Sequence, residues 1–182
     1  ESIENLEPPF LYLERCLIPH APYGYKPEEL NGSVKDYAKR QRNKTKYNYK
    51  EAVNRSIQKF EHRIDSLSNR GLLENTLTIL TADHGQMLGE NGLYGHGNLI
   101  VPEVVHVPTV FYNDSVKVSS DDWMAQVDIM PTLASATGLE TQFTNSGSGI
   151  DIFSQNQERK MVFSQLDEDE WSIWDGDGGI LF

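Results

Sequence analysis

The stretch LTILTADHG, residues 77–85, decides the fold expected for this chain. An apolar run predicts a buried strand from Thr76 to Ala82, and Asp83 and His84 follow directly where that strand ends. In open α/β sheets, ligands bind in the crevice outside the carboxyl ends of the strands. A carboxylate and an imidazole at that place are suited to hold a metal ion. The structural alternative is a turn in which Asp83 caps the next helix.

A long amphipathic pattern precedes this strand. Apolar residues recur at helical spacing on one face between Tyr49 and Arg70, and Gly71 supplies a plausible C-terminal stop. A helix followed by a strand is half of a βαβ unit, which favours a parallel sheet. We therefore expect an α/β fold with a mostly parallel sheet flanked by helices.

Further elements are expected on both sides of this unit. Apolar runs predict a strand over residues 10–13 and a second buried strand over residues 109–112. Helical spacing predicts a helix over residues 126–137, in which Pro131 must be accommodated by a turn or kink. Residues 138–157 are rich in Ser, Gly, Thr, Asn and Gln, which indicates an irregular connection.

The last part of the chain, from Lys160 onward, alternates short apolar runs with turn residues. This pattern predicts short strands joined by turns. Acidic residues gather at residues 167–170 and 175–179, which raises the possibility of a calcium loop. We interpret both groups as hairpin turns, because the twelve-residue EF-hand loop with its closing Glu is not present.

Composition narrows the classes of partner. The chain has 182 residues, 38% of them apolar, and a net charge of −11. This length and apolar content predict one domain with a core, and no apolar run is long enough to span a bilayer. The negative charge argues against a nucleic-acid groove, which needs clustered Lys and Arg. The basic cluster at residues 35–46 is interpreted as a solvated face, the alternative being that it attracts an anionic ester at a pocket mouth.

Three ordered segments carry a family resemblance. The stretch from Thr76 to Asn113 joins the Asp-His-Gly turn to a Gly-rich loop in which His96 lies between two glycines. The loop Pro-His-Ala-Pro-Tyr, residues 19–23, precedes it, and Val-Asp-Ile-Met-Pro-Thr-Leu, residues 127–133, follows it. Together they resemble the sulfatase family within the alkaline phosphatase superfamily.

The resemblance has consequences for the fold. It implies an alkaline-phosphatase-like, mostly parallel sheet flanked by helices, followed by the start of a small C-terminal antiparallel sheet. Residues 1–157 would form the C-terminal part of the sulfatase-like α/β domain, and residues 158–182 the short strands of the small sheet. The chain would thus be part of a larger enzyme, and its truncated sheet could lead to self-association. The cellular compartment, extracytoplasmic or cytoplasmic, stays open.

The resemblance also assigns a site. Asp83 and His84 would be two ligands of one divalent metal ion, and His20 and His96 would act on the oxygens or the leaving group of the substrate. The metal would be calcium in a true sulfatase and zinc or manganese in an enzyme that processes phosphoesters. Sulfatases usually carry a lysine at the place of His96, so this histidine tilts the expectation toward the phosphoester enzymes. Glu90 is expected to orient the Gly-rich loop without binding the metal.

The nucleophile of the family has no counterpart in these residues. Sulfatases use a Cys or Ser in a Cys/Ser-x-Pro-x-Arg motif, whereas Cys16 is followed by Ile and His where that motif has Pro and Arg. We therefore expect Cys16 to be a small buried residue at a strand end, and the chain to be inactive alone.

Three functions remain open at this point. The first is part of a sulfuric ester hydrolase acting on a small-molecule or glycan anionic ester. The second is part of a phosphodiesterase or of a phosphoglycerol or phosphoethanolamine transferase. The third is a structural or interaction module without catalysis.

Overall fold

The computed structural model describes residues 3–23, 32–33, 36, 39, 42–97, 99–113, 123–139, 149–154, 159–166, 168–175 and 178–181. The chain divides into two compact units, each of which combines segments that are distant in sequence. The first unit comprises residues 1–76 and 84–97, and the second comprises residues 77–83 and 98–182. The boundary between them therefore falls on both sides of the strand that precedes the Asp-His pair.

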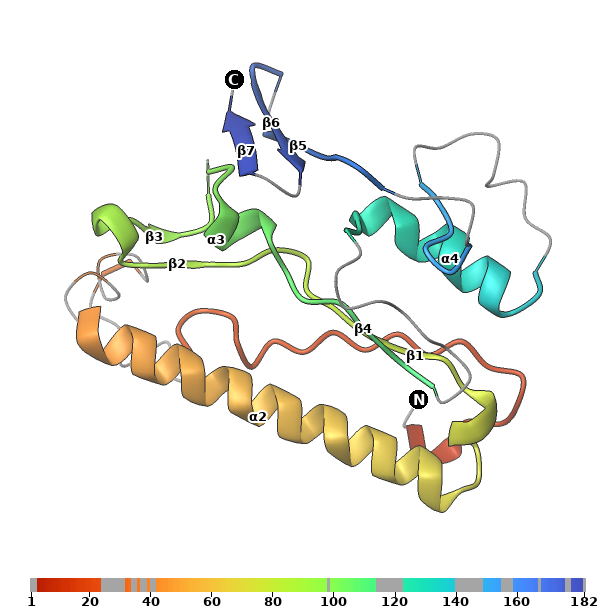
Figure 1. Ribbon diagram of the computed structural model, residues 1–182. Coiled ribbons are helices and arrows are strands. Elements are labelled where there is room, and N and C mark those ends of the chain that lie inside the picture. Colours follow the sequence, from red (N-terminus) through yellow and green to blue (C-terminus); the bar gives the residue numbers. More distant parts are fainter. Residues whose placement is uncertain are drawn as a thin grey trace. The chain divides into compact units, whose positions relative to one another are not determined.

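The first unit is built on one long helix, α2, which runs from orange to yellow in Figure 1. Its described elements are η1 (Ile3–Asn5), α2 (Arg42–Asn69), η3 (Leu73–Asn75), β2 (Met87–Leu88), η4 (Glu90–Gly92) and β3 (Tyr94–Gly95), where η denotes a 3₁₀ helix. The expected helix is thus confirmed, and it begins earlier than Tyr49.

Helix α2 ends where the glycine predicts. Gly71 has a φ of 66°, a left-handed conformation that costs glycine little. Its amide N–H donates to the carbonyl of Ser68 (2.9 Å), and the N–H of Leu72 donates to the carbonyl of Leu67 (3.0 Å). These bonds satisfy carbonyls that the last helical turn leaves open.

The prediction of a strand at residues 10–13 is wrong. The segment is extended but forms no ladder with any described strand, and in Figure 1 it runs in red beside α2. Its alternate side chains Phe10 and Tyr12 pack against a small core, which consists of Ile3, Leu6 and Leu67. Leu11 and Leu13 on the other side are 85% and 94% exposed. Helix packing replaces strand pairing here.

A charged contact ties the same segment to α2. The Glu14 carboxylate accepts a hydrogen bond from Nε of Arg63 (3.0 Å) and forms an ion pair with Lys59. Hydrogen bonds from Arg63 and Lys59 outweigh the effect of partial burial and lower the pKa of Glu14 to about 2.

The second unit contains the strand that leads to Asp83. Its described elements are β1 (Thr78–Leu80), α3 (Pro102–Val105), β4 (Val110–Tyr112), η5 (Gln126–Asp128), α4 (Ile129–Ala136), β5 (Val162–Leu166), β6 (Glu170–Asp175) and β7 (Gly178–Leu181). Both expected strands around the Asp-His pair are present. They are shorter than predicted from the apolar runs.

The pairing of these strands differs from the expectation. β1 and β4 run antiparallel, with Thr78 opposite Tyr112 and Leu80 opposite Val110. The expected mixture of helices and sheet is confirmed. All strand pairs in the described ranges are antiparallel, so the expected parallel sheet is not confirmed. β4 is also less buried than expected, because Val110 and Tyr112 are 44% and 41% exposed. Between them, Phe111 packs edge-on against Phe153, with ring centroids 5.2 Å apart.

The expected helix over residues 126–137 is confirmed as a 3₁₀ turn, η5, that continues into α4. Pro131 is the third residue of α4. An N–H in the first helical turn lacks an intrahelical acceptor, so a proline is tolerated there without a kink. The described parts of the expected connection, residues 138–139 and 149–154, contain neither helix nor strand. The rest of it lies outside the described residues.

The C-terminal strands form an antiparallel sheet in the order β5-β6-β7, as expected (Figure 1). Ser172 in the central strand is fully buried, and its hydroxyl accepts a hydrogen bond from Nε1 of Trp174 (2.7 Å). Among the helices that the structure describes, none combines the length and the apolar character needed to cross a membrane.

Candidate functional site

The end of β1 places Asp83 at an exposed position. The strand ends at Leu80, and the next residues are extended or bent rather than helical, so the alternative of a helix cap is not found. The side-chain amide of Gln126 donates to the backbone carbonyls of both Ala82 (2.9 Å) and Asp83 (2.8 Å). The backbone at the candidate ligand is therefore held by a residue of η5.

The Gly-rich loop is a β-hairpin of the first unit. Strands β2 and β3 pair antiparallel, with Met87 opposite Gly95 and Leu88 opposite Tyr94. The turn between them needs positive φ at Gly89 (117°) and Gly92 (77°), which explains its glycines. The hairpin register places the residue before β2 and the residue after β3 opposite each other.

Glu90 orients this hairpin, as the sequence predicted. Its carboxylate accepts the amide N–H of Leu88 (2.6 Å) and pairs with Lys46 of α2 (2.7 Å). Burial raises the pKa of Glu90, but Lys46 and the backbone N–H groups of Glu90 and Leu88 outweigh burial and lower it overall. Lys46, from the predicted basic cluster, therefore has a structural role.

The hairpin brings two of the predicted site residues together. The rings of His84 and His96 are stacked, with centroids 3.8 Å apart and an interplanar angle of 31°. Nδ1 of His96 lies 3.2 Å from Oε1 of Gln86, which comes from the opposite side of the hairpin. Gly95 has a φ of 90°, so the hairpin needs a glycine directly before His96.

The ring contacts indicate which nitrogen of each histidine carries hydrogen. Nδ1 of His84 lies 2.9 Å from the carbonyl of Gly85, and Nδ1 of His20 lies 2.6 Å from the carbonyl of Ala21. Carbonyl oxygens only accept hydrogen bonds, so each Nδ1 is the donor. The same argument holds for His96 and the amide oxygen of Gln86. In the neutral ring the lone pair is then on Nε2, the nitrogen suited to bind a metal or accept a proton.

His20 lies in a turn that is closed by local hydrogen bonds. The N–H of His20 donates to the carbonyl of Leu17 (3.1 Å), and the N–H of Tyr23 donates to the carbonyl of His20 (2.9 Å). The ring of Tyr23 packs edge-on against Tyr49, with centroids 5.4 Å apart. Burial, and then Tyr49, raise the pKa of Tyr23 to about 12, although a hydrogen bond with Gln86 opposes them. The structure describes this loop only to Tyr23, so the expected loop beyond it lies outside the described residues.

One sequence expectation concerns a residue near α2. Cys16 is half-buried on an extended segment rather than buried at a strand end, because the segment forms no strand. Its thiol lies 3.7 Å from the hydroxyl of Ser56. His62 is exposed on α2 itself.

The expected metal ligands are joined by a peptide bond across the boundary between the units. Asp83 belongs to the second unit and His84 to the first. Their Cα atoms are about 3.8 Å apart, as in any trans peptide. Within the described ranges, no group of three or more His, Cys, Asp and Glu side chains is arranged to hold a metal ion. The two residues supply at most part of a ligand set.

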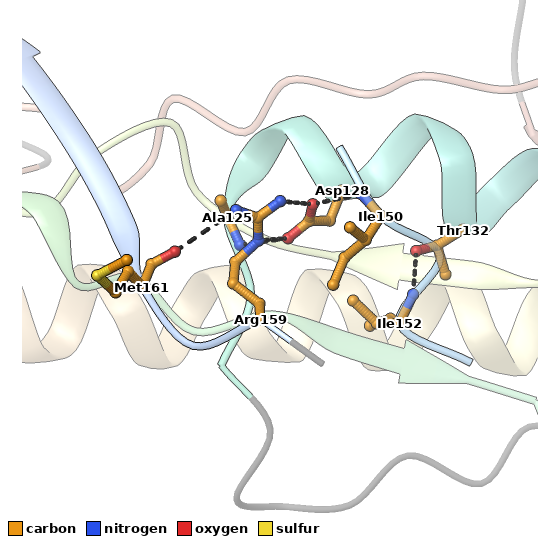
Figure 2. Close-up of polar contacts among 7 residues, drawn as sticks. All are labelled: Ala125, Asp128, Thr132, Ile150, Ile152, Arg159 and Met161. Atoms are coloured by element: carbon orange, nitrogen blue, oxygen red, sulfur yellow. Dashed lines mark hydrogen bonds and ion pairs between the residues drawn. The ribbon is translucent and has the colours of Figure 1, made fainter. Parts of the chain in front are cut away.

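The sequence did not reveal the most buried carboxylate of the second unit, Asp128. It is fully buried, and it accepts hydrogen bonds from the amides of Ala125 and Ile150 (both 2.8 Å). Nε and Nη2 of Arg159 each lie 2.5 Å from one of its oxygens, as Figure 2 shows. The available signal was an Asp at the start of an apolar helix, but its arginine partner lies 31 residues further along the chain.

The comparisons with known proteins cover these segments of the sequence. The family model for sulfatases matches residues 3–139, which include the turn with His20, the Asp-His pair and the hairpin with His96. The chain belongs to the sulfatase family.

Two curated relatives are similar to this chain. It is 30% identical to the low-salt glycan biosynthesis sulfotransferase Agl7 of Haloferax volcanii, over 98% of this chain and 48% of that protein. It is 31% identical to the choline-sulfatase of Rhizobium meliloti, over 43% of this chain and 15% of that protein. The chain thus spans about half the length of the first relative and a smaller part of the second.

Proposed function

We propose that this chain supplies part of the metal site and two substrate-contacting histidines of an enzyme that cleaves sulfate esters. One observation carries the proposal: the hairpin places the ring of His96 against the ring of the candidate metal ligand His84, with centroids 3.8 Å apart, and each ring has Nδ1 directed at an oxygen. The family of the chain and the similarity to a choline-sulfatase support the sulfate ester as substrate.

The donor set fits a divalent cation. Asp83, exposed at a strand end, has carboxylate oxygens, and the imidazole of His84 has a nitrogen donor. Calcium prefers oxygen ligands, whereas a mixed oxygen and nitrogen set suits zinc or manganese better. A bound cation would neutralise negative charge on the ester oxygens and so lower the barrier to cleavage.

His96 and His20 are proposed to handle protons and substrate oxygens. Each ring is exposed, and each has Nδ1 fixed by an acceptor, so Nε2 has a defined direction. When protonated, Nε2 can donate to an anionic oxygen or to the leaving alkoxide, and it can take the proton back in the neutral form. No residue of this chain is proposed as nucleophile, and catalysis is proposed for the whole protein only.

Metal binding is the test. We expect the chain to bind calcium, manganese or zinc, measured by isothermal titration calorimetry with each metal alone, and the variant Asp83→Ala/His84→Ala to lose this binding. The matched control is Asp65→Ala/His62→Ala, because Asp65 and His62 are exposed on α2 and are not candidate ligands. Equal metal binding by all three proteins would contradict the proposal.

A second candidate function is transfer of a sulfuryl group to a glycan hydroxyl instead of water. It is favoured by the similarity to the sulfotransferase Agl7, which extends over 98% of this chain. The two functions differ only in the acceptor of the group. Release of the phenol together with free sulfate from an aryl sulfate by the full-length protein favours hydrolysis. Release of the phenol that depends on an added glycan, with the sulfuryl group recovered on the glycan, favours transfer. A phosphoester substrate, suggested by His96, is tested in the same assay with an aryl phosphate diester.

A further inference from the structure

We propose that Gln126 is a positioning residue for Asp83, supported by the buried Asp128–Arg159 pair. This inference rests on the proposed function, because it assigns a purpose to the orientation of Asp83. All the residues involved belong to the second unit. The argument follows the contacts outward from Asp83.

The first step concerns the peptide planes on the two sides of Asp83. The carbonyl of Ala82 lies in the plane before the Asp83 Cα, and the carbonyl of Asp83 lies in the plane after it. Nε2 of Gln126 donates to both, at 2.9 and 2.8 Å. Fixing both planes fixes φ and ψ of Asp83, since the planar peptide leaves only these two soft dihedrals. The direction of its Cα–Cβ bond is then fixed as well.

The second step concerns the donor. A side-chain amide carries two N–H groups on one nitrogen, so Gln126 can serve both carbonyls without help from another residue. Gln126 is itself exposed, and its hydrogen bonds compete with water. They persist only if the backbone of Gln126 is held in place.

The third step is the turn that carries Gln126. Asp128 accepts the N–H of Ala125 with its carboxylate, while its own N–H donates to the carbonyl of Ala125 (2.9 Å). The two residues that bracket Gln126 and Val127 are thereby tied to each other twice. This reciprocal contact resembles a capping box and fixes the turn.

The fourth step anchors the turn in the unit. The Asp128 carboxylate also accepts the N–H of Ile150 and the bidentate guanidinium of Arg159, whose Nη1 contacts the carbonyl of Met161 at 3.5 Å (Figure 2). The hydroxyl of Thr132, one turn further along, accepts the N–H of Ile152 (3.2 Å). A buried, bidentate ion pair has a fixed geometry. It holds the turn in place, and Gln126 in that turn holds the backbone at the end of β1 through its two hydrogen bonds.

The experiment uses three substitutions in which the new side chain is similar in length to the glutamine it replaces. Gln126→Glu keeps the shape but replaces the donor by a carboxylate that repels both carbonyls. Gln126→Lys restores a donor. Gln58→Glu, at an exposed position of α2, is the matched control for the added charge. Asp128 and Arg159 are left intact, because their loss would threaten folding itself.

Two readouts are needed. We expect Gln126→Glu to weaken metal binding about tenfold in calorimetry, Gln126→Lys to recover most of it, and Gln58→Glu to leave it unchanged. Independently of metal, NMR should show changed amide ¹⁵N shifts and greater mobility at Asp83 and His84 in Gln126→Glu, because these nitrogens share peptide planes with the two acceptor carbonyls. If Gln126 had only a structural role, its substitution would lower stability without changing the amide ¹⁵N shifts of Asp83 and His84.

The outcomes separate the two proposals. If the parent chain and Gln126→Glu bind the metal with equal affinity, the positioning role is overturned and the proposed function stands. Absence of metal binding in the parent would overturn the proposal that Asp83 and His84 bind a metal ion within this chain, and the NMR readout would then decide on Gln126 alone. Unchanged ¹⁵N shifts and mobility at Asp83 would overturn the positioning role in either case.

Discussion

Two aspartates of the second unit, Asp83 and Asp128, show opposite uses of the same side chain. Asp128 is fully buried, and its two oxygens take hydrogen bonds from two backbone amides and one guanidinium. Asp83 is exposed, and the described hydrogen bonds reach its backbone carbonyl from Gln126. The first carboxylate is used up by the fold. The second residue is exposed, and Gln126 contacts it through its backbone carbonyl.

The difference between the two aspartates distinguishes a structural carboxylate from a candidate metal ligand. A buried charge is tolerated only when it is paired and hydrogen-bonded, so its partners are needed for stability. A ligand for a metal must keep its oxygens accessible, so its support comes through the backbone. The comparison predicts large stability effects at Asp128 and small ones at the exposed site residues.

The largest effect is expected for Arg159→Leu. This substitution leaves Asp128 as an uncompensated buried charge, which costs about 3–5 kcal/mol. Urea unfolding measures the loss, and Arg55→Leu, at an exposed position of α2, should change the free energy of unfolding by less than about 0.5 kcal/mol. Similar small losses in both variants would mean that the buried pair does not anchor the unit.

A smaller effect is expected at Glu14 in the first unit. Its pKa is lowered to about 2, so its contribution to stability is complete above its ordinary pKa of 4.5 and lost as the pH falls through about 2. Because the ion pairs are partly exposed to solvent, we expect Glu14→Gln to cost only about 1 kcal/mol at pH 7. Unfolding measured from pH 7 to pH 2 should show the two proteins converging toward the acid end. Glu51→Gln, at an exposed position of α2, should show no such convergence.

Local patterns predicted much of the fold. The apolar periodicity of α2, the left-handed glycine after it and the short strands of the C-terminal sheet depend on neighbours in sequence, and all were found. The motif around Asp83 and His84 predicted a strand end, and the Gly-rich loop that contains His96 is found as a hairpin. Such features are encoded within one or two turns of chain.

Long-range partners could not be predicted in this way. The segment at residues 10–13 has the composition of a strand, but only the folded chain shows that it packs against α2 instead of another strand. The antiparallel pairing of β1 with β4 and the ion pair of Asp128 with Arg159 likewise join residues far apart in sequence. Gln126 escaped notice for the same reason, because its acceptors lie 43 and 44 residues earlier.

The smallest effect on stability is expected for His96→Ala. It can be compared with the effect of a substitution at a buried residue of the same hairpin. His96 is exposed, so its removal should change the free energy of unfolding by less than about 0.5 kcal/mol. Met87, on β2 of the same hairpin, is 2% exposed, and Met87→Ala should cost about 2–5 kcal/mol. Urea unfolding of the two variants compares them directly. A loss at His96 as large as that at Met87 would show that the stacked histidines belong to the core of the hairpin. A negligible loss means that the fold does not need this imidazole, which leaves ligand binding as the reason for its place beside His84.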